Sequence, residues 1–455
     1  MTFSDFISLH ENDDPVRLLL SRDKYPDIDL DLAVTTLEVR RKLRTKVPEW
    51  YAVPSLIYPS RLSGEQCSSS ETARYKASIA ASSGREGTPP ETASATLRPL
   101  PQALSPSPES KLSVSDPNPA GPSLLCGRGW PQVSEGVPSL PKIADLTGGM
   151  GVDAWAFSQV AEEVLYNEIQ PDLARATELN FRELGVGNVR FRNERVEPGK
   201  VREVLDGFEP DVIYLDPARR AEDGKKVFLI EECQPDVLTL LPELFEASRY
   251  VLLKLSPMAD ITMACKRLGT HVKEVHTVAS GGECKELLFL LDREWDGPHS
   301  VVVVEGGATM EISGCSSINS ESTGKFGKPG VGDILFEPGK ALTKAGAFDL
   351  PCVRFGLMKL AAHTHLYVGE AVPEELRPFG KLFEVLEVLP LNNRAMKEAG
   401  KRWPQAEVTA RNVPMTSELL RRKAGCASGG DIHLFGVRVE EASEAGNYLI
   451  VTKRN

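Results

Sequence analysis

Short apolar runs alternate with amphipathic stretches between residues 141 and 293. The stretches from 153 to about 161 and from Pro171 to Leu184, closed by Gly185, have helical periodicity. The apolar runs are predicted strands at Ile143–Asp145, Val164–Glu168, Val189–Asn193, Val212–Asp216, Tyr250–Lys254, Lys273–Val278 and Glu286–Leu291. This alternation predicts an α/β domain with a mostly parallel, doubly wound sheet.

The flanking regions have different patterns. Residues 1–81 predict a helical domain, with one helix over 31–46 that ends near Val47-Pro48 and another over 70–81. Residues 82–140 hold eleven of the 33 prolines, and this composition predicts a disordered linker or insertion. Residues 300–370 and 371–455 predict small α+β modules, with strands at Val301–Val304 and Tyr448–Val451 and a short helix at Ser417–Lys423.

Composition narrows the class of protein. A chain of 455 residues predicts two to four domains. We expect no membrane association, because apolar windows of about 18 residues are absent. We expect no signal peptide, because residues 1–5 show no basic-then-apolar pattern, and the eight cysteines form no CxxC pair. We therefore expect a reducing cytoplasm, without a zinc ribbon or disulfide framework.

The charge distribution is compatible with RNA as a partner. The net charge of −11 weighs mildly against extensive nucleic-acid binding, but local patches set the footprint. Two basic stretches are candidates, 40–46 and 392–423, and the second holds eight Lys/Arg against three Glu. Either stretch could also be an ordinary solvated helix face.

A glycine-rich turn follows the first predicted strand, at Asp145-Leu146-Thr147-Gly148-Gly149-Met150-Gly151-Val152-Asp153. Such a turn lets a ligand approach the backbone, and the following helix offers free N–H groups. The second strand ends in Glu168, whose carboxylate could accept both hydroxyls of a ribose, and the third ends in Asn193-Glu194, where an adenine would lie. The predicted cofactor-binding residues are Asp145, Thr147, Gly148, Gly149, Gly151, Asp153, Glu168 and Asn193.

The fourth strand ends in Asp216-Pro217-Ala218-Arg219. Proline stops the strand and fixes the chain, so that carboxylate and carbonyl groups can hold an amino group of a planar base. The simpler interpretation is a turn after a strand. Asp216, Pro217 and Arg219 are the candidate catalytic residues, with Arg219 on a phosphate or base edge.

Together these motifs resemble class I methyltransferases that depend on S-adenosylmethionine (SAM). Asp145–Asp153 is similar to their motif I, Glu168 to the ribose-binding acid, and Asp216–Arg219 to the motif of base-modifying members. The chain further resembles a bacterial methyltransferase family with a C-terminal THUMP-like domain, in segments at 14–15, 24–29, 65–66, 72–76, 254–257, 282–286, 337–339, 344–348, 410–412 and 434–436. This resemblance implies a helical N-terminal domain, a Rossmann-like methyltransferase sheet over 141–293, a ferredoxin-like module and a THUMP-like end.

The resemblance implies SAM as cofactor and methylation of a base nitrogen in RNA. RNA would bind through the two basic stretches. A small-molecule methyltransferase and a non-catalytic RNA-binding protein with a SAM fold are the alternatives. Methylation of uridine C5 is disfavoured, because it needs a cysteine nucleophile and 254–257 reads Lys-Leu-Ser-Pro.

Two further expectations concern the surroundings of the site. The helix around Gln66–Lys76 could close over the cofactor, or could be purely structural. No metal is expected, because His363 and His365 lack a third ligand in the sequence pattern.

Overall fold

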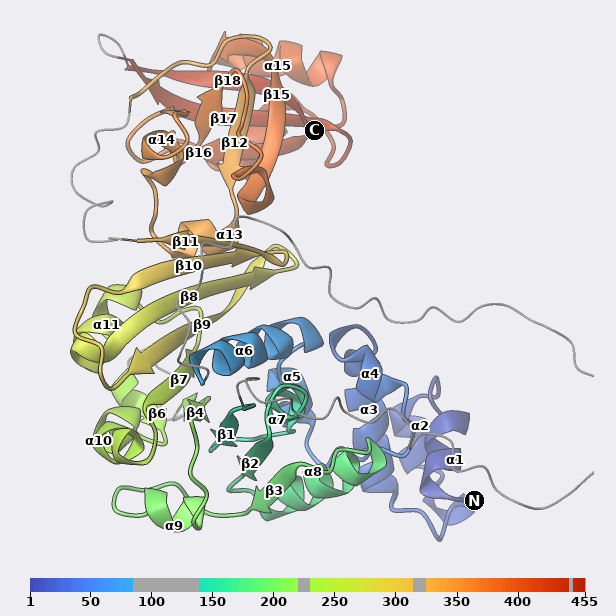
Figure 1. Ribbon diagram of the computed structural model, residues 1–455. Helices are drawn as coiled ribbons and strands as arrows, with labels where there is room; N and C mark the ends of the chain where they lie inside the picture. The colour runs from blue at the N-terminus through green and yellow to red at the C-terminus, as the bar shows by residue number, and fades with distance from the viewer. Residues whose placement is uncertain (85–138, 220–229, 314–324, 442–444, 455) are drawn as a thin grey trace, which may run out of the picture.

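The larger of two main sheets is doubly wound. The computed structural model describes residues 1–84, 139–219, 230–313, 325–441 and 445–454 (Figure 1). The sheet has nine strands in the order β11-β10-β8-β9-β7-β4-β1-β2-β3. Five of them run parallel: β1 (Lys142–Asp145), β2 (Glu163–Asn167), β3 (Val189–Arg192), β4 (Val212–Leu215) and β7 (Tyr250–Leu255). The predicted parallel α/β sheet is confirmed.

The other four strands extend this sheet beyond β7. β9 (Glu283–Asp292) lies antiparallel between β7 and β8 (Val272–Ser280). β10 (Ser300–Glu305) pairs in parallel with β8, and β11 (Ala308–Ile312) forms the edge.

Helices cover both faces of the sheet. Strand residues such as Ile213 and Leu253 pack on one face, with α9 (Val201–Leu205), α10 (Val237–Ala247) and α11 (Ile261–Leu268). Their neighbours Val212 and Leu252 pack on the other face, with α7 (Val152–Ser158) and α8 (Pro171–Glu183). Because successive side chains of a strand point to opposite faces, a strand covered on both faces is continuously apolar, which explains β4.

The N-terminal domain is helical, as predicted. It comprises α1 (Phe3–Leu9), α2 (Pro15–Leu19), α3 (Leu30–Lys46), α4 (Pro48–Tyr51), α5 (Arg61–Gln66) and α6 (Ser70–Ser83). The last of these, α6, packs against α7 of the large domain (Figure 1). The helix α3 ends at the predicted place, with Val47 as its C-cap.

A seven-stranded sheet forms the C-terminal end, in the order β13-β14-β12-β15-β18-β17-β16. The strands are β12 (Ile334–Pro338), β13 (Met358–Lys359), β14 (Tyr367–Gly369), β15 (Gly380–Pro390), β16 (Glu407–Arg411), β17 (Ile432–Glu440) and β18 (Ala445–Arg454). Helices α15 (Asn393–Arg402) and α16 (Ser417–Ala424) pack against one another and on one face of this sheet.

The two sheets share a hydrophobic core. Helix α13 (Lys340–Lys344) follows β12 and packs on β8, β9 and β10. The Glu305 carboxylate accepts the backbone N–H of Ala341 at 2.8 Å, and Lys344 Nζ donates to the Ala259 carbonyl at 2.8 Å. The C-terminal part is therefore fixed to the large domain by packing as well as by chain connection.

One predicted boundary differs from the structure, and one sheet spans the two predicted C-terminal modules. Val301–Val304 is predicted in the 300–370 module, but it lies in β10, which pairs with β8 of the large sheet. A continuous run of valines is typical of a strand that is covered on both faces. The modules 300–370 and 371–455 also share one sheet, since β15 pairs with both β12 and β18. Most of the predicted linker, 85–138, lies outside the described residues. Within the described ranges, the helices lack the length and apolar character of a membrane span.

Candidate cofactor and acceptor site

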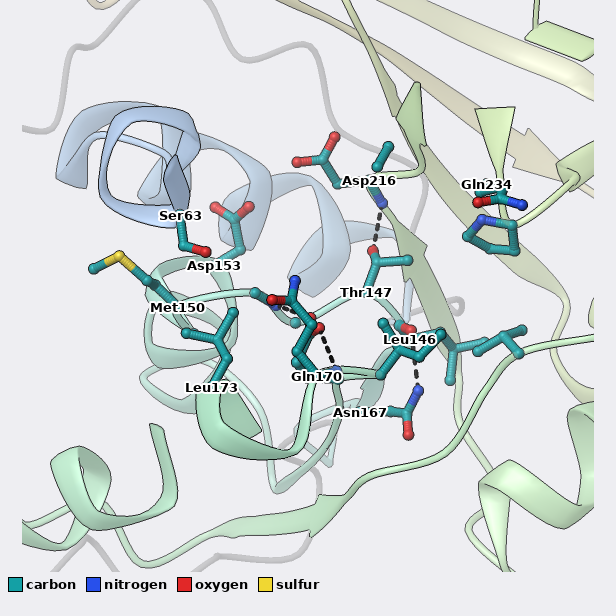
Figure 2. A pocket seen from close by; sticks show the side chains of 18 of the residues that line it. Ser63, Leu146, Thr147, Met150, Asp153, Asn167, Gln170, Leu173, Asp216 and Gln234 are labelled. Atoms are coloured by element: carbon teal, nitrogen blue, oxygen red, sulfur yellow. Dashed lines mark hydrogen bonds between the residues drawn. The ribbon is translucent and has the colours of Figure 1, made fainter. Parts of the chain in front are cut away.

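A pocket of about 420 Å³ lies at the carboxyl ends of β1, β2 and β4 (Figure 2). The turn after β1 lines it, with the end of β2, residues 194–198 after β3, and Asp216 after β4. Ser63, Gln66, Cys67 and Ser68 form a further wall from α5 and the α5–α6 connection. Ligands of doubly wound sheets bind at this edge, so the pocket lies where the sequence pattern predicts it.

The glycines of the turn are required by its packing. A Cβ on Gly148 would lie 2.1 Å from the Tyr166 ring, and one on Gly151, whose φ is +85°, would lie 2.6 Å from Thr177. The Gly148 N–H donates to the Asn167 carbonyl at 2.8 Å. The turn therefore packs closely against β2 and α8 at positions where only glycine fits.

Glu168 is fixed before any ligand arrives. One carboxylate oxygen accepts the N–H of Gly149 and the other accepts the N–H of Gln170, both at 2.9 Å. The residue is 6% exposed and lines the pocket. Each oxygen keeps a second lone pair, so the carboxylate can still accept two hydroxyl groups.

Asp145 carries a buried oxygen without a partner. Its Oδ1 accepts the Thr147 N–H at 3.1 Å, but Oδ2 has no hydrogen-bond partner among the described residues. Burial and the nearby Asp153 raise the pKa of Asp145 well above its ordinary value. An unsatisfied buried oxygen is costly, so this position favours a ligand donor or a bridging water.

Asp153 belongs to a buried polar network that joins three parts of the chain. Its carboxylate accepts hydrogen bonds from Ser68 Oγ and Tyr214 OH, both at 2.9 Å, and lies 3.2 Å from Lys76 Nζ. Lys76 Nζ also lies 3.0 Å from both Glu286 oxygens. Burial opposes ionisation of Asp153, but the Lys76 and Lys254 ammoniums and the two hydroxyls outweigh it and lower the pKa of Asp153.

Asp216 lies beside the glycine turn. Its backbone N–H donates to Thr147 Oγ1 at 2.6 Å (Figure 2). Its Oδ2 lies 2.5 Å from Lys254 Nζ, while no described residue is bonded to Oδ1. Burial alone would lower the pKa of Lys254, but Asp216, Glu286 and Asp153 raise it above its ordinary range, so the ammonium stays charged. Asp216 therefore lines the pocket with one carboxylate oxygen that has no partner in the described part of the chain.

Other predicted residues are placed differently. Asn193 does not line the pocket; its amide donates to the Glu168 carbonyl at 2.5 Å, and the next residue, Glu194, lines the pocket instead. Pro217 is buried outside the lining. Arg219 lies in β5 (Ala218–Arg219), but its side chain is outside the described part of the chain.

Several site residues were not predicted. Lys76, Lys254 and Glu286 lie in segments that carry the family resemblance, but nothing in the sequence pattern indicates their partners. The range Gln66–Lys76, expected to form one helix over the cofactor, is divided between the end of α5, a connection and the start of α6. Gln66, Cys67 and Ser68 line the pocket, but no residue of α6 does, so closure by that helix stays a prediction.

Among the described cysteines and histidines, Cys67 alone lines the pocket. Cys67 lines the pocket, but burial raises the pKa of its thiol, which makes it a poor nucleophile. Cys233, Cys265 and Cys284 are not among the lining residues. Within the described ranges, His, Cys, Asp and Glu form no group of three that could hold a metal, and His365 stacks on Phe348 instead.

The two basic stretches are used differently. In the N-terminal stretch, Arg40 is buried against the carbonyls of Tyr51 and Val53, Arg41 donates to the Glu11 carbonyl, and Lys42 pairs with Glu65. In the C-terminal stretch, four arginines are paired with glutamates: Arg394, Arg402, Arg411 and Arg421. Lys397, Lys401, Arg422 and Lys423 are exposed and have no ion pair within the described residues.

Comparison with known proteins shows the fold. Residues 335–376 match a family model described as a ferredoxin-like domain, and residues 380–454 match one described as THUMP domain-like. No curated protein matches by sequence. The crystal structure of a "putative methyltransferase" from Porphyromonas gingivalis W83 aligns with a TM-score of 0.76 and 27% identity, over 99% of this chain and 97% of that one.

Two smaller solved structures align with only part of the chain. A "putative methyltransferase" from Streptococcus mutans in complex with SAH aligns at TM-score 0.25 and 14% identity, over 34% of this chain and 89% of that one. An rRNA methylase from Streptococcus thermophilus aligns at TM-score 0.25 and 12% identity, over 34% of this chain and 88% of that one. The chain thus has an α/β sheet domain with ferredoxin-like and THUMP-like modules at its C-terminal end.

Proposed function

We propose that this chain, which shares its fold with the Porphyromonas protein over nearly its whole length, is a SAM-dependent methyltransferase that modifies a base nitrogen in RNA. One observation carries the proposal. Asp216 lines the same pocket as Glu168 and the glycine turn, so a strand-end carboxylate stands beside the residues that would hold the cofactor.

The residues of the pocket fit SAM. Glu168 would accept the ribose hydroxyls with its two pre-placed oxygens. The unpartnered Oδ2 of Asp145 would receive a donor, directly or through water, from the amino group of the methionine part. SAM, when bound, supplies a methyl group on a sulfonium, which gives a neutral thioether once the methyl has left.

Asp216 would position the acceptor. Its free Oδ1 can accept an N–H of an amino group, which turns the nitrogen lone pair toward the methyl group. The nitrogen would take the methyl group that bound SAM supplies, and Asp216 or water would take the nitrogen proton. No covalent bond to the enzyme is needed, which agrees with the raised pKa of Cys67.

The expected loss on removing the ribose acid is large. Glu168→Ala deletes two charge-assisted hydrogen bonds and should weaken SAM binding by about 2–4 kcal/mol. Calorimetric titration with S-adenosylhomocysteine (SAH) measures it. Glu163→Ala is the matched control, because Glu163 lies on the same strand but pairs with Arg190 at the surface. Equal affinities for the two variants would refute the cofactor assignment.

The exposed Lys and Arg side chains of α15 and α16 that have no ion pair among the described residues would bind the RNA backbone. We call Lys397, Lys401, Arg422 and Lys423 the C-terminal basic surface. The two helices cross closely, since a Cβ on Gly400 would lie 1.9 Å from the Ala424 carbonyl oxygen. Lys401 and Lys423 therefore flank one crossing point, where a phosphate chain could contact both helices.

Salt dependence tests this surface. Replacing Lys401 and Lys423 by Gln should weaken RNA binding and lower the slope of log K against log salt by about 0.7 for each phosphate that is no longer neutralised. Filter binding at several salt concentrations measures the slope. Arg394→Gln is the control, because Glu398 already neutralises Arg394. An unchanged slope in the double variant would place the RNA elsewhere.

Methyl transfer from tritiated SAM tests the function itself. Total RNA from a strain that lacks this gene should accept label, and RNase treatment should abolish its retention. Label that survives RNase and elutes with small molecules would point to a small-molecule methyltransferase instead. A folded protein that binds RNA but neither SAM nor SAH would be a binding protein.

A further inference from the structure

The end of the pocket next to Asp216 is backed by a small set of ionised groups. Two ammoniums, Lys76 and Lys254, face three carboxylates, Asp153, Glu286 and Asp216. Lys76 is fully buried and forms ion pairs with Asp153 and Glu286. Lys254 Nζ lies 2.5 Å from Asp216 Oδ2. Lys254 is thus the cation that balances the acceptor-side carboxylate.

The set leaves room for one added positive charge. Burial raises the pKa of Glu286 despite its two ammonium neighbours, and burial with Asp153 keeps the pKa of Asp145 well above its usual range. Within this set of five side chains, the three carboxylates outnumber the two ammoniums by one. The sulfonium of a bound donor would match that charge, and Asp216, already paired with Lys254, would be a weak partner for a second cation beside it.

We propose that Lys254 sets acceptor specificity: by pairing with Asp216 it admits a neutral nitrogen, such as the amino group of a nucleobase, and excludes a protonated aliphatic amine. This inference rests on the proposed function and narrows its substrate class. Without Lys254, Asp216 would be an unpaired carboxylate, which attracts an ammonium group more than a neutral amino group. Lys254 is thus a positioning residue that acts through Asp216.

The inference can be tested without knowing the acceptor. Sinefungin is a SAM analogue that carries an amine, protonated at neutral pH, in place of the sulfonium methyl group. SAH lacks this group. Calorimetry on the full chain gives the ratio of the SAH Kd to the sinefungin Kd. This ratio reports how strongly the acceptor end of the pocket binds a cation.

Lys254→Met should raise that ratio at least about tenfold over wild type, equivalent to about 1.4 kcal/mol. Lys254→Arg keeps the cation and should retain the wild-type ratio. Asp216→Asn leaves Lys254 unpaired and should lower the ratio by a similar factor. This opposite sign keeps the test valid if Lys254→Met fails to fold.

The outcomes separate the two proposals. A ratio that moves up in Lys254→Met and down in Asp216→Asn supports the inference. Ratios equal to wild type in both variants, with SAH still bound, would overturn the role of Lys254 and leave the proposed function standing. Absence of SAH binding by the folded wild-type chain would overturn the proposed function, and the inference with it.

Discussion

Replacing Asp216 by alanine should cut methyl transfer to RNA by on the order of 10²-fold or more while SAM binding stays nearly intact. The carboxylate lines the pocket with one oxygen unpartnered among the described residues, so its loss would remove the group proposed to orient the acceptor nitrogen. The backbone N–H that bonds Thr147 Oγ1 remains in the variant, so the cofactor turn keeps its support. Initial rates with tritiated SAM, together with calorimetric titration of SAH, measure both effects.

Cysteine variants provide the control for this prediction. Cys67→Ser, alone or with Cys233, Cys265 and Cys284 also changed to Ser, should retain activity. Full activity of Asp216→Ala would remove Asp216 from the mechanism. An adduct with 5-fluorouracil-substituted RNA that disappears in Cys67→Ser would show covalent C5 chemistry instead.

Replacing Lys76 by methionine should lower the free energy of unfolding by about 3–5 kcal/mol. The ammonium is fully buried and lies within 3.2 Å of Asp153 and Glu286, so the variant leaves two buried carboxylates without their shared cation. The same change should loosen the α5–α6 wall of the pocket, because Lys76 Nζ also donates to Ser68 Oγ at 2.9 Å. Urea unfolding followed by circular dichroism measures the loss.

A surface lysine of the same neighbourhood provides the comparison. Lys285→Met removes an exposed ion pair with Glu283 and should change stability by less than about 0.5 kcal/mol. Adding Glu286→Gln to Lys76→Met should recover part of the loss, since one buried charge is then removed. If Lys76→Met costs less than about 1 kcal/mol, the network contributes little to stability.

Local patterns were enough to predict the sheet and the cofactor edge. Apolar runs such as Val212–Leu215 mark strands buried on both faces, and each strand is followed by its polar residue at the same edge. Gly148 and Gly151 could be singled out because a turn between strand and helix needs positions without Cβ, and the Tyr166 and Thr177 contacts show why. Glu168 and Asp216 could be predicted because each is the polar residue that follows a buried strand at this edge of the sheet.

Contacts between distant segments could not be predicted. Lys76 and Glu286 are 210 positions apart, and a buried lysine looks like any helical lysine in the sequence. The basic run at 40–46 suggested an RNA surface, but Arg40 faces backbone carbonyls in the interior. The prediction for Asn193 rests on its position at the predicted end of the strand. In the structure β3 ends one residue earlier, at Arg192, and Glu194 lines the pocket instead of Asn193.

Nucleoside mass spectrometry after reaction with methyl-deuterated SAM tests the central claim most directly. Purified protein would be incubated with RNA from a strain lacking the gene, and the RNA would be digested to nucleosides. The expected result is one labelled nucleoside with the trideuteromethyl group on a nitrogen of the base, formed on the order of 10²-fold more slowly or less when Asp216→Ala is used. Label on C5 of uridine or on the ribose, or no labelled nucleoside from an enzyme that binds SAM, would contradict the account.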